Sequence, residues 1–235
     1  MPVTGNNPFT DKRLSICVSA GGFSFISAAA QVRKEVEAGQ LQAELRSELK
    51  KFALVNNDFS EVTLLVDGLS TRIPLNEFRS EEVQSLLRLT YGNGVPEGTV
   101  IRYEVLPALE LVEVYALTPE VEDIVKEVFP NVVTHSLHGQ VLLRGMEAEA
   151  RMPLGKRRMH ASVEGEQLML FTFVDNRLSY CNTFAADDLQ GRMYYTLYVW
   201  THLELAQERD ILVLHGNDEE FHTEIKNFIR DIECA

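Results

Sequence analysis

Cysteine is scarce in this chain of 235 residues, which contains only Cys17, Cys181 and Cys234. The number is odd and the spacing fits no metal-ligand set, so the sequence predicts neither a disulfide framework nor a cysteine metal site. Cys17 and Cys181 lie in apolar, strand-like runs, and we expect them to be small buried side chains. Cys234, close to the last residue, is expected to be exposed. We therefore expect the fold to depend on no disulfide bond and on no cysteine-bound metal.

Long apolar runs are also lacking, since no segment approaches the ~20 consecutive apolar residues that span a bilayer. The first residues, MPVTGNNPFTDKR, are polar and lack the apolar core of a secretory signal. We therefore predict no direct membrane insertion and a cytoplasmic location. A hydrophobic content of 45% and a charged content of 24% are typical of a globular protein.

Basic charge is low: 22 Lys and Arg face 35 Asp and Glu, which gives a formal net charge of -13. This charge repels nucleic-acid phosphates and anionic lipid headgroups, so nucleic acid is excluded as an expected direct partner. The one basic run is Lys156-Arg157-Arg158. We interpret it as a solvated linker between two lobes, with a phosphate or an acidic partner as the less favoured alternative.

A plan of strand, tight turn and strand occurs twice. It covers Leu14 to Ala30 and again Met159 to Asp175, and the copies align without a gap when Arg13 is laid on Arg158. The first turn is Ala20-Gly21-Gly22, and a predicted helix follows each copy. A chain of this length can form two lobes, each with its own core. We predict a first lobe over residues 1–152, with an inserted hairpin and helices, and a second lobe over 153–235.

Periodicity and turn residues place the other elements. A helical stripe begins at Leu41, and Thr118-Pro119 begins a helix that Pro130 ends. Asp67-Gly68, between two short apolar runs, predicts a β-hairpin. Further strands are expected at 100–105, 111–117 and 131–137, helices after Ser80 and over 138–150, and an exposed loop at 91–98. The second lobe is expected to run strand, strand, strand, helix, strand, helix, and its last helix carries an apolar stripe, namely Phe221, Ile225, Phe228, Ile229 and Ile232.

A repeated unit of three antiparallel strands, a helix, a strand and a helix is similar to the fold shared by actin, sugar kinases and the heat-shock ATPases, a ribonuclease H-like α/β architecture. The segments Leu14-Ser15-Ile16, Gly22-Phe23-Ser24-Phe25, Asp67 to Phe78 and Leu212 to Gly216 resemble an uncharacterised, Bacteroidetes-type bacterial family. That family is a domain-of-unknown-function family with a degenerate actin-like ATPase fold. The resemblance therefore implies a fold and no particular reaction.

The resemblance also implies a place for phosphates, at the two hairpin turns. Active members of the superfamily use an Asp in the first turn to hold metal-bound phosphates, whereas Ser19-Ala20-Gly21-Gly22 has no acid. The second turn, Glu164-Gly165-Glu166, lacks a run of glycines, and the adenosine-side loop has Gly216 where paired glycines are usual. We therefore predict no catalytic residue, no cofactor and no metal, and a vestigial nucleotide cleft whose candidate residues are Ala20, Gly21, Gly22, Gly165 and Gly216.

Other constellations have simpler interpretations. The pairs His135 with His138 and His215 with His222 straddle strand-to-helix boundaries without a completing ligand. The glycines of the 91–98 loop are followed by no Lys-Ser or Lys-Thr, as a phosphate loop requires. The aromatic set Tyr194, Tyr195, Tyr198 and Trp200 has helical spacing, which favours core over a stacking platform. Two apolar stripes run along the same predicted helix: one comprises Leu189, Met193, Leu197, Trp200 and Leu203, and the neighbouring one comprises Tyr194, Tyr198, Thr201 and Leu205. Tyr195 lies off both stripes and becomes an interface candidate if exposed.

We therefore predict a non-enzymatic interaction or scaffold protein with an unknown protein partner, and its oligomeric state stays open, with a homo-oligomer as one alternative. The first rival hypothesis is an ATPase or small-molecule kinase that recruits acids from elsewhere, such as Asp67 or Asp175. The second rival is a cytoplasmic platform component of a membrane assembly. The binding of Mg-ATP separates the scaffold from the ATPase.

Overall fold

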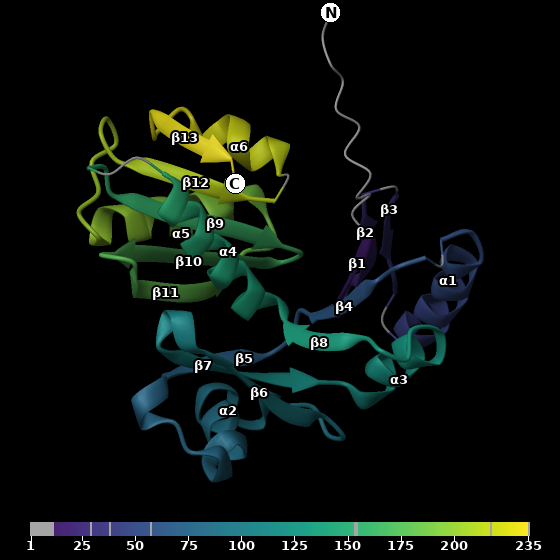
Figure 1. The fold of residues 1–235 in the computed structure, drawn as a ribbon. Helices are drawn as coiled ribbons and strands as arrows, with labels where there is room; N and C mark the ends of the chain where they lie inside the picture. The colour runs from purple at the N-terminus through teal and green to yellow at the C-terminus, as the bar shows by residue number, and fades with distance from the viewer. Residues whose placement is uncertain are drawn as a thin grey trace, which may run out of the picture. The chain divides into compact units, whose positions relative to one another are not determined.

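The computed structural model describes residues 12–28, 30–37, 39–56, 58–152, 155–216 and 218–234 (Figure 1). The chain divides into two compact units. Unit 1 comprises Met1–Val105 and Val112–Leu137, and unit 2 comprises Leu106–Leu111 and His138–Ala235. Each unit contains a five-stranded sheet, and the two sheets have the same strand order. The repeated plan of the sequence thus corresponds to a repeated topology.

The five-stranded sheet of unit 1 has the order β3-β2-β1-β4-β8. Its strands are β1 (Arg13–Ser19), β2 (Gly22–Ser27), β3 (Gln31–Glu35), β4 (Glu61–Val66) and β8 (Val133–Ser136). β2 is antiparallel to both β1 and β3, whereas β4 runs parallel to β1 and β8 runs parallel to β4. The carboxyl ends of β1 and β4 therefore meet at one edge, beside the turn that joins β1 to β2.

Two helices bury the apolar face of this sheet: α1 (Leu41–Val55) and α3 (Pro119–Val128). As the sequence predicts, α1 presents Leu45, Leu49 and Phe52 to the core, where the Phe52 ring contacts Phe25 at 5.2 Å between centroids. Thr118 caps α3 with extended backbone, and proline occupies the first turn, where its missing N–H costs no hydrogen bond. These local signals are sufficient to place both helices.

A three-stranded sheet, β5-β7-β6, is inserted between β4 and α3. It comprises β5 (Ser70–Pro74), β6 (Val100–Leu106) and β7 (Leu111–Leu117), covered by α2 (Val83–Tyr91). The predicted hairpin across Asp67-Gly68 is wrong, because β4 and β5 belong to different sheets. Neither residue has the positive φ that a two-residue hairpin turn requires. Short 3-10 turns lie at Leu75–Glu77, Ser80–Glu82, Gly92–Gly94 and Pro107–Leu109.

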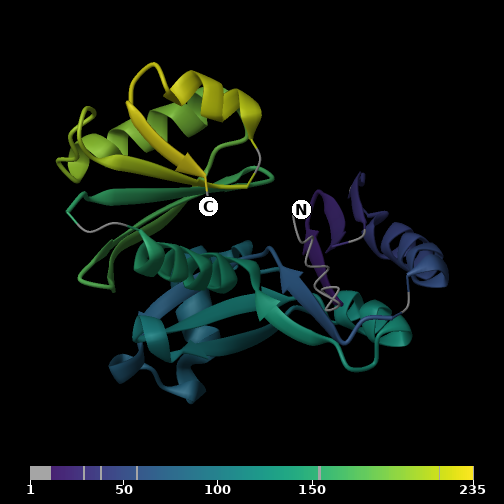
Figure 2. The ribbon, with the colours of Figure 1, turned by 45° about the horizontal axis from the view of Figure 1, so that its top comes forward.

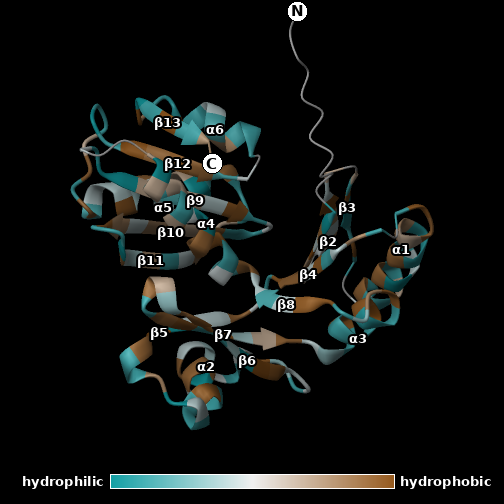
Figure 3. Ribbon diagram, in the orientation of Figure 1, coloured by the Kyte–Doolittle hydropathy of each residue, from teal (hydrophilic) through white to brown (hydrophobic). Residues whose placement is uncertain are grey.

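The sheet of unit 2 has the order β11-β10-β9-β12-β13. Its strands are β9 (Arg158–Glu164), β10 (Gln167–Val174), β11 (Arg177–Ala185), β12 (Ile211–His215) and β13 (Asp231–Cys234). Helices α5 (Leu189–His202) and α6 (Glu219–Ile225) cover one face, and α4 (Leu137–Arg151) lies on the other, as Figure 2 shows. Because both faces are covered, β12 is apolar along its length (Figure 3).

Helix α4 belongs to unit 2 from His138 onward, whereas the predicted boundary at 152/153 would leave it in the first lobe. The physical basis is close packing of α4 on β9 and β10. A Cβ at Gly145 would lie 2.4 Å from the ring of Phe171, so the glycine lets helix and sheet approach. Glu149 adds an ion pair to Arg158 and a hydrogen bond to His160.

The predicted last helix is wrong beyond Ile225. There α6 ends, a turn follows, and Ile232 lies in β13, which pairs in parallel with β12. Apolar residues three or four apart can serve a short helix and then a strand, so the stripe alone does not locate the end. Cys17 and Cys181 are also less buried than expected, being half-buried, while Cys234 is exposed as predicted.

The aromatic residues of α5 differ from the prediction in an instructive way. Trp200 is buried in the core, as expected, but Tyr194 and Tyr198 are 63% and 56% exposed. Tyr195 packs inward instead, with its ring stacked on Phe184 at 4.5 Å. The buried face of the helix is therefore narrower than its two apolar stripes indicate. Tyr194 and Tyr198, which lie on a stripe, are exposed, whereas Tyr195, which lies off both stripes, packs on the core.

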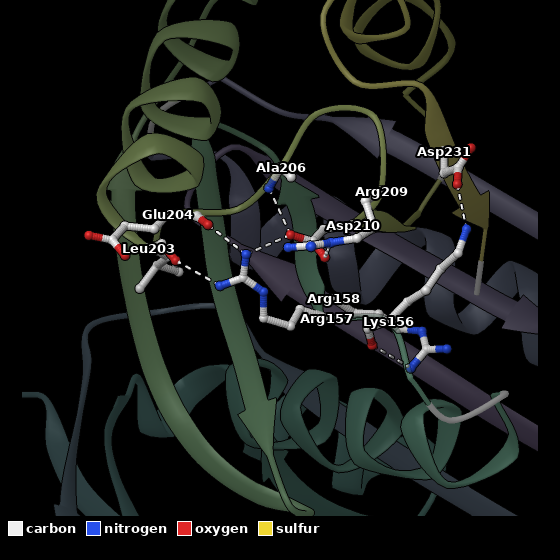
Figure 4. Close-up of polar contacts among 9 residues, drawn as sticks. All are labelled: Lys156, Arg157, Arg158, Leu203, Glu204, Ala206, Arg209, Asp210 and Asp231. Carbon is white, nitrogen blue, oxygen red and sulfur yellow. Dashed lines mark hydrogen bonds and ion pairs between the residues drawn. The ribbon is translucent and has the colours of Figure 1, made fainter.

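The basic run is only in part the solvated linker of the prediction: Lys156 and Arg157 are exposed, but Arg158 is buried at the start of β9, and all three side chains are paired within unit 2. Figure 4 shows the pairs of Lys156 and Arg157. Lys156 Nζ lies 2.6 Å from Asp231, and Arg157 Nη2 lies 2.8 Å from the buried carboxylate of Asp210. Arg157 also donates to the carbonyls that end α5, at Leu203 and Glu204. These intramolecular pairs weaken the alternative of a phosphate site here.

Across the described ranges, no helix is both long and apolar enough to cross a bilayer.

Candidate functional site

The turn between β1 and β2 holds the first three candidate residues. Ala20 and Gly21 are exposed, whereas Gly22 is buried and pairs with Glu35 of β3. A Cβ at Gly22 would lie 2.2 Å from the carbonyl oxygen of Lys34, but a Cβ at Gly21 would meet nothing within 4 Å. The glycine at position 22 is therefore required by the close approach of β3, and its presence needs no phosphate to explain it.

Asp67 is an acid close to this turn. It follows β4 directly, and its amide donates a 2.9 Å hydrogen bond to the carbonyl of Val18, near the end of β1. Parallel pairing of β1 with β4 thus brings Asp67 beside the β1–β2 turn, although 47 positions separate it from Ala20 in the sequence. Asp67 is therefore an acid from outside the hairpin that lies beside the first turn.

Asp175, the other acid considered for recruitment, lies at the wrong end of its strand. It forms a two-residue turn with Asn176, at φ of 51° and 61°, between β10 and β11. The turn that corresponds to a phosphate turn, at Gly165, lies at the opposite end of β10. Eight residues of strand span roughly 26 Å, so Asp175 cannot reach that turn.

The second turn and the loop that follows β12 are tied together by one arginine. Arg192 of α5 donates to the Gly165 carbonyl at 3.2 Å and to the Ala186 carbonyl at 3.1 Å, and its guanidinium lies 2.6 Å from Asp218. Asp218 in turn caps α6 by accepting from the amide of Phe221. The guanidinium is thereby engaged by protein acceptors beside the second turn.

Gly216 follows β12 with a φ of 96°, a conformation that favours glycine. It lines a small pocket of about 50 Å³ in unit 2. The lining of this pocket combines apolar side chains with several titratable groups. Its lining residues are Ala161, Val163, Leu214, His215, Gly216, Asp218, Glu219, Phe221, His222 and Cys234. Among the candidate residues, Gly216 alone lines this pocket.

A buried polar chain adjoins the pocket. His160 of β9 is fully buried, and its Nε2 lies 2.9 Å from Glu149 Oε1 of α4, while its Nδ1 lies 2.8 Å from His215 Nε2 of β12. The rings of Phe171 and Phe173 contact His160 at 4.8 and 5.7 Å. Three elements of unit 2 therefore meet in one hydrogen-bonded chain surrounded by aromatic carbon.

The environment shifts the pKa values of His215 and Glu149, the two ends of this hydrogen-bonded chain. Burial, with the charges of His160 and Arg144, lowers the pKa of His215 to about 4. Burial acts to raise the pKa of Glu149, but the hydrogen bond from His160 and the charge of Arg158 outweigh it and hold this pKa below its usual value. At neutral pH the chain therefore has an anionic end at Glu149 and a neutral end at His215.

The sequence analysis weighed His215 only with His222 and did not identify Glu149 or His160. A signal exists in β9, where Arg158, His160 and Ser162 alternate with apolar residues and are all buried. Buried polar residues at every second position indicate that a polar element covers that face. The partner of His160 in α4, Glu149, lies 11 positions away in the sequence, and its partner in β12, His215, lies 55 positions away, so no local spacing reveals them.

The histidines singled out by the sequence lie where predicted, with His135 in β8 and His138 in α4. The hydrogen bond from His135 to Glu104, at 2.7 Å, raises the pKa of this histidine. Searching the residues that the structure describes finds no group of three His, Cys, Asp or Glu side chains placed to hold a metal ion.

Comparison with solved structures defines the class of protein as one with an actin-like ATPase fold. A protein of unknown function with this fold, from Bacteroides thetaiotaomicron VPI-5482, matches with a TM-score of 0.73 at 26% identity, over 96% of this chain and 91% of that chain. The PilM-PilN type IV pilus biogenesis complex matches with a TM-score of 0.56 at 13% identity, over 96% and 88%. The predicted fold class is therefore confirmed.

The chain belongs to the DUF3822 family, a family of proteins of unknown function, whose model matches residues 8–232. The predicted resemblance to an uncharacterised bacterial family is confirmed by this match and by the Bacteroides structure. No curated protein matches the sequence.

Proposed function

We propose that this protein is a non-catalytic member of the actin-like fold that acts by binding a protein partner. The observation that carries the proposal is the state of the two turns. The first has no acid and uses Gly22 to pack β3. At the second, Arg192 is engaged by the Gly165 carbonyl and by Asp218. The first turn therefore brings no carboxylate of its own to a metal-bound triphosphate, and the arginine at the second turn already pairs with a carboxylate.

The kind of partner is inferred from a structural neighbour. The PilM-PilN complex contains a chain of similar fold together with a protein partner. A chain of this fold can therefore serve as a binding partner, and the same role for the present chain accounts for a retained fold with altered turns. A platform for a membrane assembly, on the cytoplasmic side, is the narrower version of this proposal.

Nucleotide binding provides the first test. A ligand at a hundred times its dissociation constant stabilises a protein by ~2.7 kcal/mol, which is a rise in melting temperature of roughly 5 to 10 °C for a chain of this size. We expect no rise with millimolar Mg-ATP and no phosphate release above the no-enzyme rate. A nucleotide-binding protein of the same fold serves as the positive control. A rise of several degrees would overturn the proposal.

A specific observation favours one rival, because Asp67 lies beside the first turn. If Mg-ATP does stabilise the protein, Asp67→Asn should remove the stabilisation. Asp175→Asn is the matched control, since Asp175 lies at the far end of β10 and should leave the effect unchanged. Equal loss in both variants would exclude a site built around Asp67.

Capture of the tagged full-length chain from its own cells under mild lysis tests the partner. We expect one or a few proteins in stoichiometric amount, and subunits of a membrane assembly would support the platform version. Light scattering of the purified chain gives its oligomeric state and identifies self-association as an alternative. A monomer that retains no protein in repeated captures would count against the interaction role.

A further inference from the structure

The hydrogen-bonded chain of Glu149, His160 and His215 has a property that does not depend on the proposed function. Both ring nitrogens of His160 are engaged, at 2.9 and 2.8 Å, so any change in its protonation must pass to a neighbour. An ionised carboxylate only accepts hydrogen bonds, and therefore Nε2 of His160 carries a hydrogen in every state in which Glu149 is charged. The contact between the two imidazoles holds one further hydrogen.

That hydrogen has two possible places. When His160 is neutral, its Nδ1 has no hydrogen and accepts from Nε2 of His215, which leaves Nδ1 of His215 as a bare acceptor. When His160 is an imidazolium, its Nδ1 donates to Nε2 of His215, and the hydrogen of the neutral His215 ring is then on Nδ1. Both states satisfy every hydrogen bond of the chain with the same positions of the heavy atoms.

We propose that Glu149, His160 and His215 form a proton-linked switch, in which the binding of one proton at His160 converts Nδ1 of His215 from a hydrogen-bond acceptor into a donor. His215 lines the pocket beside Gly216. The hydrogen-bonding character of its ring therefore changes with pH without movement of the backbone. Proton binding at the buried His160 of β9 thus changes the tautomer of His215 on β12, which lines a pocket.

The surroundings support this assignment. His160 and not His215 contacts the carboxylate of Glu149, at 2.9 Å, so the additional proton is placed on His160. Burial, with the charges of His160 and Arg144, lowers the pKa of His215 to about 4, which keeps that ring neutral. The rings of Phe171 and Phe173 contact His160 and exclude water from it. Two further charged groups act on the chain, Arg144 of α4 on His215 and Arg158 of β9 on Glu149. The titratable groups that line the pocket beside His215 are Asp218, Glu219 and His222 of the β12–α6 segment and Cys234 of β13.

The test is long-range ¹H–¹⁵N correlation of the histidine rings in the full-length protein, labelled with ¹⁵N-histidine, from pH 4.5 to pH 9. We expect His160 and His215 to change in one transition with a common midpoint. His215 should change its tautomer and not acquire hydrogen on both nitrogens. A single tautomer of His215 across the range, or separate midpoints for the two rings, would overturn the proposal.

Glu149→Gln tests the role of the carboxylate, because glutamine keeps the shape and can still accept from Nε2 of His160. Without the negative charge the shared transition should move down by about one pH unit or more. His222→Gln is the matched control, since His222 lines the same pocket outside the chain, and it should leave the midpoint in place. Circular dichroism confirms that each variant is folded, and the wild-type tautomer measurement tests the switch without any variant.

Discussion

Replacing Gly22 with alanine tests why the first turn has kept its glycines. The added methyl carbon would lie 2.2 Å from the Lys34 carbonyl oxygen, which belongs to the backbone of β3, so no side-chain rotation relieves the contact. The backbone at Gly22 has a φ of 154°, which alanine adopts only with strain. Either β3 must withdraw from β2 or the turn must change its conformation.

The expected cost follows from what β3 supports. Val32 packs against the core of unit 1, and Lys34 forms ion pairs with Glu44 and Glu48 of α1, so displacement of β3 disturbs contacts on both sides. Overpacking of this kind costs about 1 to 3 kcal/mol, and an alanine restricts the unfolded chain enough to offset only about 0.4 to 1 kcal/mol of that. With an overpacking cost of about 2 kcal/mol the net loss is about 1 to 1.6 kcal/mol, and for a chain of this size the melting temperature should fall by roughly 2 to 6 °C.

Gly21→Ala is the matched control one position away. Its Cβ would meet nothing within 4 Å, and Gly21 does not have a positive φ. We therefore expect its free energy of unfolding to remain within about 0.5 kcal/mol of the wild type or to rise slightly. Thermal melting followed by circular dichroism and urea unfolding at 25 °C measure both variants under the same conditions.

The reasoning would be refuted if Gly22→Ala and Gly21→Ala unfolded at the same temperature and urea concentration. A different result would contradict the structural role of Gly22, namely that Mg-ATP stabilised the wild type but not Gly22→Ala while the two proteins were equally stable without nucleotide. That result would mean that the glycine is kept for the approach of a ligand, and it would revive the ATPase hypothesis.

Three further predictions concern the ion pairs and the aromatic helix. Burial acts to raise the pKa of Glu122, but hydrogen bonds from its partners lower it to about 2, so the stabilisation by its charge is complete above pH 4.5 and lost as the pH falls through 2. Glu122→Gln should therefore flatten the acid limb of stability against pH, measured by urea unfolding, and an unchanged limb would contradict this. Asp210→Ala should cost about 1 to 3 kcal/mol in urea unfolding, because the amide of Ala206 loses its buried acceptor and the half-exposed Arg157 loses its carboxylate partner. A loss under about 0.5 kcal/mol would show that this pair contributes little. Tyr195→Ser should lower the melting temperature, and Tyr194→Ser should leave it nearly unchanged, since only the first ring is packed on the core; the reverse order would mean that α5 is rotated.

Much of the fold could be predicted, because its signals are local. Thr118-Pro119 determines the start of α3, and Asp175-Asn176, which adopts two positive φ values, determines a hairpin turn. Asp67-Gly68 has a similar composition but follows β4 into another sheet. The choice between turning back and crossing to another sheet depends on what β5 pairs with, and that partner, β7, lies about 40 residues further along the chain.

The candidate site could be predicted only in part, for the same reason. The repeated plan identifies Gly22 and the family resemblance identifies Gly216, and both have structural roles in their turns. The chain through His160 depends on the packing of α4 against β9, and therefore on which unit contains α4. Sequence spacing does not decide that question, because the helix lies between the two units in the chain and could cover either sheet.

The inserted sheet has a consequence for how this family can diverge. β4 and β8 pair as neighbours, although a whole sheet and helix α2 lie between them in the chain. The entropy of closing a loop grows only with the logarithm of its length, so a tenfold longer connection costs about 2 kcal/mol more. A segment that brings its own core, as β5-β7-β6 does with α2, can more than recover that amount. We therefore expect relatives to vary most in length and sequence between β4 and α3, while β1 and β4 remain in register.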